Sequence, residues 1–428
     1  MSKAANCSIP SDWTLTTLGT VSECTLGGTP STDVPEYWNG EIPWMASGDV
    51  NLRRVHAVAG RITRAGLAAS NATLIYPPAV AVGLAGQGKT RGTVALTLFT
   101  VCTNQSIAML QGNSASLQTE FLFHNLDHRY EELRARSSGG GRGGLSKGIL
   151  DVVPIKLPPL PEQYCISKIL DTLDVAIGQT EAIIEKLKLV KQGLLHDLLT
   201  RGIDANGELR PPQSQAPHLY KDSPLGWIPN NWDALQFSVL ARYTNGNTFD
   251  AGCWGSHGLP IIRIQNLNGS NSFNYFEGPV NSRWHVFPGD LLFAWSGQRG
   301  VSFGPRIWSG PEGVLNQHIF KVIEKKDVIS KEFLFEILRF RQSVIEDSAH
   351  GFKDSFLHVT RGELGAVFAG IPSRDEQSMI VARIAAFESR LREECASLAK
   401  NVALKRGLME DLLIGRVRVT PLLDILGS

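Results

Sequence analysis

The chain has few cysteines, no long apolar run and almost no excess of charge. Its cysteines never occur as Cys-x-x-Cys, so the sequence indicates neither a disulfide framework nor a zinc site. No stretch approaches the roughly 18 consecutive apolar residues of a membrane span, and the first residues lack the apolar core of a signal peptide. We therefore expect a cytoplasmic protein with reduced thiols and no membrane span.

The balance of charge limits how the chain could bind an acidic partner. The 42 basic and 41 acidic residues give a formal net charge of +1. A nucleic-acid binder of this composition must gather its basic residues locally, because no overall excess attracts the ligand. Catalytic motifs are also missing: the histidines show no metal-ligand spacing, and no Pro-Pro pair has the Asn/Asp-Pro-Pro-Tyr/Phe form of an adenine methyltransferase. Any methyl transfer therefore belongs to a partner.

A long segment, in contrast, occurs twice. Residues 161–200 and 375–414 align without a gap at an offset of 214, and eleven positions between Glu162 and Leu199 are identical in both copies. Apolar residues recur in steps of four and three, as on the seam of a coiled-coil helix. The seam of the first copy comprises Leu173, Ile177, Thr180, Ile184, Leu187, Lys191, Leu194 and Leu198. The seam of the second comprises Phe387, Leu391, Leu398, Leu408 and Leu412, interrupted by Glu394, Asn401 and Lys405.

These patterns predict two long helices that pack against each other. A helix of about 38 residues is ~57 Å long, too long to bury its seam alone. The polar interruptions of the second seam are candidates for contacts with partner proteins. The alternative is an ordinary core helix in each half of the chain.

Each helix follows a β-rich domain of similar length. Short apolar runs separated by Gly, Pro, Asn and Ser predict strands before the first helix, with one helix at residues 117–136. Landmarks recur in the same order before the second helix, including Ile-Pro-x-x-Trp at Ile9 and Ile228 and Glu-Phe-Leu-Phe at Glu120 and Glu332. The two domains are thus expected to share a topology while most of their loops differ.

One motif could point to a nucleotide-binding enzyme instead. Residues Gly83 to Thr90 fit G-x-x-x-x-G-K-[ST], the P-loop pattern. A P-loop opens a helix whose N-terminus faces the phosphates, but here the alternating segment 93–99 predicts a strand. The equivalent segment of the second domain, 296–300, contains no Gly-Lys-Thr. We therefore interpret the match as a β-hairpin tip, with a P-loop NTPase as the alternative.

The order of these motifs resembles the DNA-specificity subunits of Type I restriction-modification systems. The resemblance rests on Ile-Pro-x-x-Trp in both domains, the Leu157-Pro158-Pro159-Leu160-Pro161-Glu162-Gln163 start of the first helix, its Gly193-Leu194-Leu195 end, Gly207-Glu208-Leu209-Arg210, and the segment Asp222 to Pro229. It covers nearly the whole chain. The second helix departs from the pattern, because Ile371-Pro372-Ser373-Arg374 precedes its Asp375-Glu376-Gln377.

The resemblance implies an α+β fold with a pseudo-two-fold internal repeat: two β-rich target-recognition domains separated by two long antiparallel helices that form a coiled coil. The corresponding boundaries are 1–156 for the first domain, 157–200 for its helix, 201–225 for an extended linker, 226–374 for the second domain and 375–428 for the last helix and tail. It also implies a non-catalytic chain that binds double-stranded DNA, two methylation subunits and restriction subunits. S-adenosylmethionine, ATP and Mg would then lie on those partners, and this chain would hold no cofactor.

The residues themselves favour a compatible function. Two similar domains on a rod of ~57 Å could contact DNA half-sites up to ~17 base pairs apart, at ~3.4 Å per base pair. Because the loops differ, the half-sites should differ. The remaining alternative is a coiled-coil scaffold whose domains bind protein or carbohydrate.

Polar, basic and glycine-rich loops supply the candidate DNA contacts. In the first domain these are Gly28, Thr29, Ser31, Arg53, Arg54, Gln87, Lys89, Arg91, Arg142, Ser146 and Lys147. In the second they are Asn245, Asn247, Arg263, Gln265, Asn266, Gln298, Arg299, Lys353 and Arg361. We assign the hairpin tips to base reading and the Gly-rich and Thr-Arg-Gly stretches to phosphates. The alternative for any one of them is a solvated loop residue.

Overall fold

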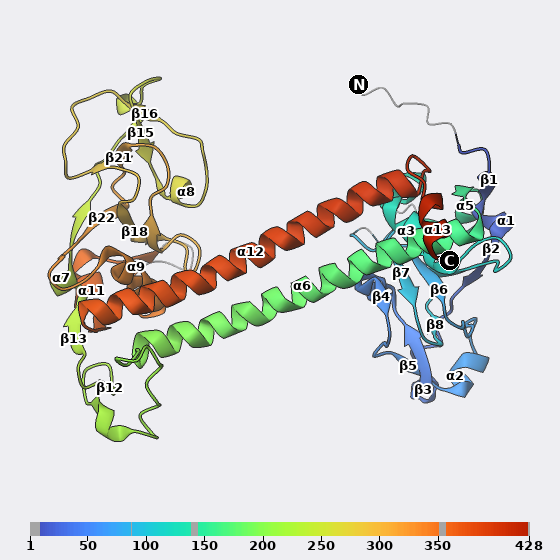
Figure 1. Cartoon of the computed structure of the whole chain (residues 1–428), viewed down its shortest axis with the longest axis horizontal. Coiled ribbons are helices and arrows are strands. Elements are labelled where there is room, and N and C mark those ends of the chain that lie inside the picture. The colour runs from blue at the N-terminus through green and yellow to red at the C-terminus, as the bar shows by residue number, and fades with distance from the viewer. Residues whose placement is uncertain (1–8, 87, 138–143, 351–356, 427–428) are drawn as a thin grey trace. The chain divides into compact units, whose positions relative to one another are not determined.

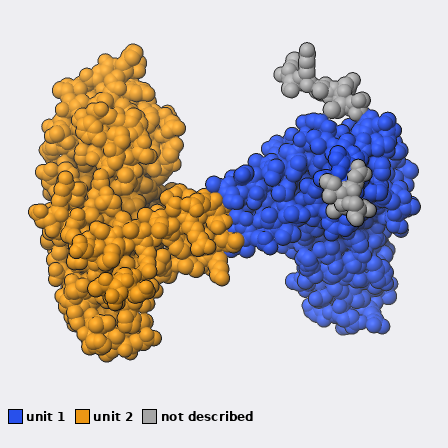
Figure 2. All heavy atoms as spheres, in the orientation of Figure 1, with its two compact units in different colours: residues 1–182, 395–428 blue, residues 183–394 orange. Residues whose placement is uncertain are grey.

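A computed structural model describes residues 9–86, 88–137, 144–350 and 357–426. The chain forms two compact units (Figure 2). Unit 1 comprises Met1–Ala182 and Cys395–Ser428, and unit 2 comprises Ile183–Glu394. Each unit contains one β-rich domain and part of both long helices, α6 (Leu160–Thr200) and α12 (Arg374–Leu412) (Figure 1).

The domain of unit 1 is built on a five-stranded sheet. Its strand order is β2 (Ser22–Leu26), β9 (Ile107–Gly112), β6 (Ala79–Gly83), β7 (Val94–Thr97) and β4 (Arg54–Val55). Side chains alternate between the two faces of a strand. Val80 and Val82 accordingly join a core that includes α3 (Thr119–His128), whereas Ala79 and Ala81 join a separate core on the other face. The central strands are therefore buried on both sides.

Smaller elements complete this domain. A three-stranded sheet has the order β5 (Arg61–Ile62), β3 (Trp38–Met45) and β8 (Cys102–Thr103), and β1 (Thr14–Thr17) pairs with β10 (Pro154–Leu157) just before α6. The short helices are α1 (Leu18–Val21), α2 (Arg64–Ala68), α4 (Tyr130–Arg136) and α5 (Lys147–Asp151). The helix predicted at 117–136 is present, divided at Arg129 into α3 and α4.

The domain of unit 2 repeats this topology. Its first sheet has the order β14 (Ala241–Asn245), β22 (Ile319–Glu324), β18 (Leu291–Ala294) and β20 (Gly304–Ile307). Its second sheet has the order β16 (Tyr275–Phe276), β15 (Leu259–Ile262), β21 (Gly313–Leu315) and β17 (His285–Val286). The parallel pair β15–β21 corresponds to the parallel pair β3–β8. Around the sheets lie α7 (Phe237–Leu240), α8 (Ile264–Leu267), α9 (Lys331–Phe340), α10 (Gln342–Asp347), α11 (Arg361–Ala366), and the strand pairs β13 (Asp233–Gln236) with β24 (Phe368–Ile371) and β19 (Ser296–Gly297) with β23 (Leu357–His358). The expectation of a duplicated domain is confirmed.

The two long helices pack in antiparallel fashion within each unit. In unit 1, Ile166 and Leu170 near the start of α6 share a core with Met409 and Leu412 at the end of α12. In unit 2, Leu198 at the end of α6 shares a core with Ile380 and Ile384 near the start of α12. Every predicted seam residue is buried or half-buried, which confirms the helical period.

The polar interruptions of the second seam also face inward. Lys405 is 7 % exposed, and Glu394 and Asn401 are half-buried. The Lys405 ammonium lies 2.5 Å from an oxygen of Asp174, and the ammonium of Lys191, its counterpart in the repeat, lies 2.5 Å from an oxygen of Glu388. Both pairs have residue numbers that sum to 579 (405 + 174 and 191 + 388), so the helices meet in the same register in the two units. The buried Lys405 is thus a partner for the opposite helix, which differs from its expected exposure to another protein.

The repeated Glu-Gln at the start of each long helix binds that helix to the β-rich domain of its unit. The Glu162 carboxylate accepts from the Trp13 indole at 3.0 Å and from Arg418, and the Glu376 carboxylate accepts from the Trp232 indole at 3.1 Å and from Arg210. Each arginine follows the end of the opposite helix. The tryptophans are those of the Ile-Pro-x-x-Trp motif, so the motif tethers the start of each domain to a helix.

The neighbouring glutamines form an equivalent pair of contacts. The amide oxygen of Gln163 accepts from the backbone N–H of Gln118, and that of Gln377 accepts from the backbone N–H of Ser330, at 2.8 and 2.9 Å. In both cases the acceptor holds the start of the helix that lies on the sheet. The Glu-Gln identity between the repeats therefore has a structural cause.

Two segments test other expectations. Segment 201–225 was expected to be an extended linker, but it packs within unit 2: Ile203, Arg210 and Tyr220 are buried, and Arg210 pairs with Glu376. The Gly83–Thr90 segment leads from β6 to β7, which pair antiparallel, so the P-loop match lies on a hairpin with no helix after it. Among the described residues, no helix combines the length and apolar character needed to cross a membrane.

Candidate nucleic-acid interface

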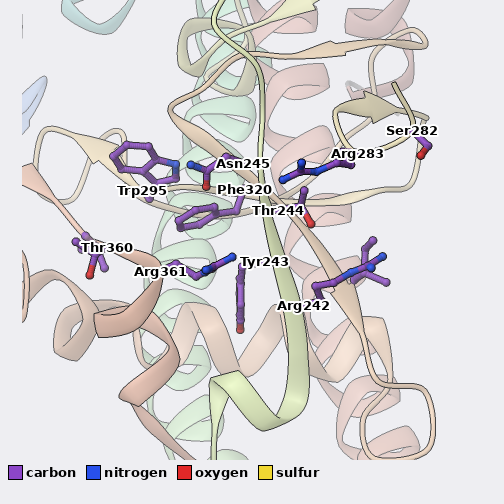
Figure 3. A pocket seen from close by; sticks show the side chains of 12 residues that line it. Arg242, Tyr243, Thr244, Asn245, Ser282, Arg283, Trp295, Phe320, Thr360 and Arg361 are labelled. Atoms are coloured by element: carbon purple, nitrogen blue, oxygen red, sulfur yellow. The ribbon is translucent and has the colours of Figure 1, made fainter. Parts of the chain in front are cut away.

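A pocket of about 750 Å³ opens on the domain of unit 2 (Figure 3). Strand β14 forms one wall with its last four residues, 242–245. The other walls come from Ser282 and Arg283, from Trp295 after β18, from β22, and from residues 359–361 at the start of α11. The Trp295 ring stacks on Phe320 with centroids 5.6 Å apart. A shallower hollow beside it shares Arg242 and Arg361 and adds Lys325.

The pocket is basic. Arg242, Arg283 and Arg361 are exposed and line it, and none of the described residues that line it is Asp or Glu. Within the described ranges, none of these three guanidinium groups has an ion-pair or hydrogen-bond partner. A chain with a net charge of +1 thus gathers three unpaired cations at one place, as local recognition of nucleic acid requires.

The predicted residues of this domain separate into two groups. Asn245 and Arg361 line the pocket, and Gln298 is exposed after β19, the short strand that follows Trp295. Arg299 instead pairs with Asp347 at 2.6 Å, and Arg263 lies over the Trp254 ring and donates to Asn274.

The remaining predicted residues of the second domain serve the loops around them. Asn266 is buried, and its amide bonds the backbone of Arg263, Ser270 and Ser272, so it stabilises its own loop. Gln265 lies beside it with a 3.5 Å contact to the Ser272 carbonyl. The backbone N–H of Asn247 donates to Leu315. Lys353 lies outside the described residues.

In the first domain, Gly28, Thr29 and Ser31 form a loop between β2 and β3. The Gly28 N–H donates to Thr103, and a Cβ added at Gly28 would lie 2.4 Å from the backbone nitrogen of Ala72, so only glycine fits. The Thr29 hydroxyl donates to Gln105. The Ser31 carbonyl accepts from the Trp38 indole. Thr29 and Ser31 are exposed and remain accessible to a ligand.

Arg53 and Arg54 face the helices rather than a loop surface. Arg53 forms a two-bond pair with Asp127 at 3.0 and 2.9 Å, and Arg54 pairs with Asp171. Asp174 lies 3.6 Å from each arginine. These ion pairs neutralise two cations that the sequence predicts to bind DNA, so Arg53 and Arg54 do not belong to the candidate interface.

Ion pairs join a charged cluster formed by Arg53, Arg54, Asp127, Asp171, Asp174, His124 and Lys405. Burial lowers the pKa of His124 and of Lys405 below their ordinary values. Burial alone would raise the pKa of Asp171, but hydrogen bonds from His124 and Arg54 bring it below its ordinary value. His124, Asp171 and Asp174 could in geometry ligate a metal, with ligand atoms within 4.8 Å of one another. Three cations already balance the three carboxylates, so the cluster gives no support for a metal site.

The other predicted residues of the first domain lie around the β6–β7 hairpin and α5. Lys89 is exposed on the hairpin, and Arg91 is half-buried at its base. Ser146 caps α5 by accepting from Ile149, and the Lys147 ammonium donates to the Cys24 carbonyl at 2.9 Å. Gln87 and Arg142 lie outside the described residues.

Sequence reasoning missed most of the pocket. Arg242, Thr244, Arg283 and Trp295 were not among the candidates, whereas Thr360 belongs to the Thr-Arg-Gly stretch predicted to contact phosphates. The sequence carried one signal that Arg242 is an exposed, variable position. Arg242 alternates with buried residues in β14, and the residue aligned with it in the first domain, Glu23, has the opposite charge. Arg283 carries no such signal, because only the fold brings its loop beside β14.

Comparison with known proteins agrees with this architecture. Residues 10–189 match the family model for the Type I restriction modification DNA specificity domain. Residues 10–189 thus carry a Type I DNA-specificity domain. The Type I restriction enzyme MjaVIII specificity subunit of Methanocaldococcus jannaschii is 22% identical, covering 96% of this chain and 94% of that protein. The EcoBI specificity subunit of Escherichia coli is 25% identical over 37% of this chain and 32% of its own length.

Solved structures show the same fold. The Type I restriction-modification S subunit from M. genitalium superposes with a TM-score of 0.57 at 15% identity, covering 96% of this chain and 98% of that one. The matched model describes a DNA specificity domain, and these relatives are named as specificity subunits of Type I restriction enzymes.

Proposed function

We propose that this chain reads an asymmetric, bipartite double-stranded DNA target, with one half-site recognised by each domain. The observation that carries the proposal is that two domains of one topology present different surfaces at matching positions. Strand register aligns Arg242 with Glu23 and Asn245 with Leu26. Unlike surfaces on like frameworks suit unlike half-sites.

The contacts follow from this division. Exposed Lys89 and Gln298 lie on hairpin segments suited to base edges, whereas Asn245, Arg361 and the other pocket residues suit the backbone and the adjoining groove. Gln87, Arg142 and Lys353 stay predictions for the same surfaces. The exposed loop residues Thr29 and Ser31 complete the surface of the first domain.

Partner subunits supply the chemistry in this proposal. Two methylation subunits, docked on the helices, carry S-adenosylmethionine and modify an adenine turned out of the duplex. Restriction subunits supply cleavage and use ATP and Mg. The complex acts in the cytoplasm, and the chain itself holds no cofactor.

The proposal is tested by assembling the full chain with its methylation subunits and footprinting random-sequence duplexes. We expect protection of two short sequences separated by an unprotected spacer. Methylated adenines mapped across the host genome should fall within the same two sequences. Equal protection of all sequences would overturn the proposal and favour a scaffold with other ligands.

A further inference from the structure

We propose that the pocket of unit 2 holds the DNA phosphate backbone, and that the second domain thereby makes an electrostatic contact that the first domain lacks. The inference rests on the proposed DNA-binding function and specifies how the binding energy divides between the domains.

The chemistry of the pocket fits a phosphodiester. Guanidinium groups present paired donors that match phosphate oxygens, and they stay charged at any physiological pH. Arg242, Arg283 and Arg361 come from three separate segments around β14 (Figure 3). Thr244, Asn245 and Ser282 add neutral hydrogen-bonding groups of the kind that position a DNA backbone.

These three cations are available to a ligand, unlike several other arginines of the chain. Arg53, Arg54 and Arg299 are already paired with carboxylates. A cation in a short ion pair must give up that partner before it gains a phosphate. The three pocket arginines have no such pair within the described part of the chain, so a phosphate would add to their interactions without replacing any.

The described residues of the first domain do not form the same constellation. Its strand register places Glu23, Leu26 and Ala108 where the second domain has Arg242, Asn245 and Phe320. The Leu84 carbonyl accepts from the Leu145 N–H, just as the Trp295 carbonyl accepts from the Val359 N–H. Leu84 therefore occupies the position of Trp295 in the first domain. Lys147 corresponds to Arg361, but its ammonium donates to the Cys24 carbonyl.

The first domain has a hollow that corresponds to the shallower hollow beside the pocket, which Arg242 and Arg361 also line, and its charge is mixed. Glu23, Lys147 and Asp151 line it. Two carboxylates beside one engaged lysine repel a phosphate, so the first domain must bind DNA through other residues. The duplication kept the framework and changed the electrostatics of this surface.

Salt dependence of DNA binding tests the inference. The logarithm of the DNA-binding constant falls linearly with the logarithm of the salt concentration, and each phosphate contact adds about 0.9 to the steepness of that line. The triple variant R242Q/R283Q/R361Q, in the complex with methylation subunits and on a target duplex, should lose a slope of about 2.7. The methylated sequence should stay unchanged, because backbone contacts do not select bases.

Two variants in the first domain serve as matched comparisons. R64Q removes one exposed cation that pairs with Glu41, and it should leave the slope unchanged. E23R places a cation at the position of Arg242, and it should raise the slope by about 0.9. Thermal unfolding of each variant checks that the fold is retained.

An unchanged slope in the triple variant, with sequence-selective binding retained, would overturn this inference and leave the proposed function intact. A slope that falls equally in R64Q would also overturn it, since any lost cation would then have the same effect. Absence of selective binding by the unaltered chain would instead refute the proposed function.

Discussion

Substitution of Glu376 tests whether a buried ion pair holds unit 2 together. The Glu376 side chain is 3 % exposed and accepts from Arg210 at 2.5 and 2.9 Å, from the Ile203 N–H at 2.9 Å and from the Trp232 indole at 3.1 Å. E376Q removes the charge while keeping the shape. Arg210, a residue only 8 % exposed, is then left with a buried guanidinium that has lost its carboxylate.

The expected loss is large because an uncompensated buried charge costs about 3 kcal/mol or more. At roughly 1.4 kcal/mol per factor of ten, that loss raises the local opening constant of unit 2 more than a hundredfold. Hydrogen exchange of the backbone amides in residues 376–384, measured by mass spectrometry, reports that opening.

The matching change in unit 1 is a built-in control. Glu162 has the same tryptophan and arginine contacts, but Arg418 also pairs with Asp12 at 2.6 Å and is more exposed. E162Q should therefore cost only about 1 kcal/mol. Replacing both charges, in E376Q/R210M, should recover part of the loss, as removal of a whole buried pair usually does. Equal losses in E376Q and E162Q, or no recovery in the double variant, would refute this reasoning.

Two other predictions concern the charged cluster and the helices. Burial lowers the pKa of His124, so below its ordinary pKa of about 6.5 the unfolded chain takes up a proton that the folded chain does not. The free energy of unfolding should therefore fall on acidification from pH 6.5, by at most ~1.4 kcal/mol per pH unit. The variant H124Q should remove that part of the pH dependence, as measured by urea titrations at several pH values. If H124Q and the unaltered chain lose stability in parallel between pH 7 and 5, His124 is not the titrating group. Insertion of four residues, about 6 Å of helix, near Thr200 should lengthen the DNA spacer by about one to two base pairs with both half-sites unchanged. An altered half-site with an unaltered spacer, read from methylated adenines, would contradict a spacing role for the helix.

The helices and the duplicated topology were predictable because their signals are local and periodic. Leu173, Ile184 and Leu198 repeat with the helical period, and that period alone fixes which face is buried. The strands of the first domain were similarly marked by short apolar runs between turn residues. Identity at an offset of 214 then extended each interpretation to the second half.

The charged residues could not be assigned in the same way. Arg53 and Arg54 look like DNA-binding cations in sequence, but their carboxylate partners lie 74 and 117 residues away. Lys405 looks like a break in a seam because Asp174 is 231 residues distant. Whether a cation is paired or available depends on contacts between remote segments, and a single sequence does not reveal those contacts.

The segment after the first helix illustrates the same limit. Its Pro, Gly and charged residues are typical of a linker, but Arg210 is buried against Glu376, 166 residues away. Composition indicates that such a segment forms no regular helix or strand. It does not indicate whether the segment packs.

Exchange of residues 14–151 for the corresponding domain of another family member tests the central claim most directly. The hybrid chain, assembled with its methylation subunits in a host, is characterised by mapping methylated adenines across the genome. We predict that one half-site changes while the other half-site and the spacer stay the same. A change in both half-sites, or in neither, would contradict independent reading of DNA by the two domains.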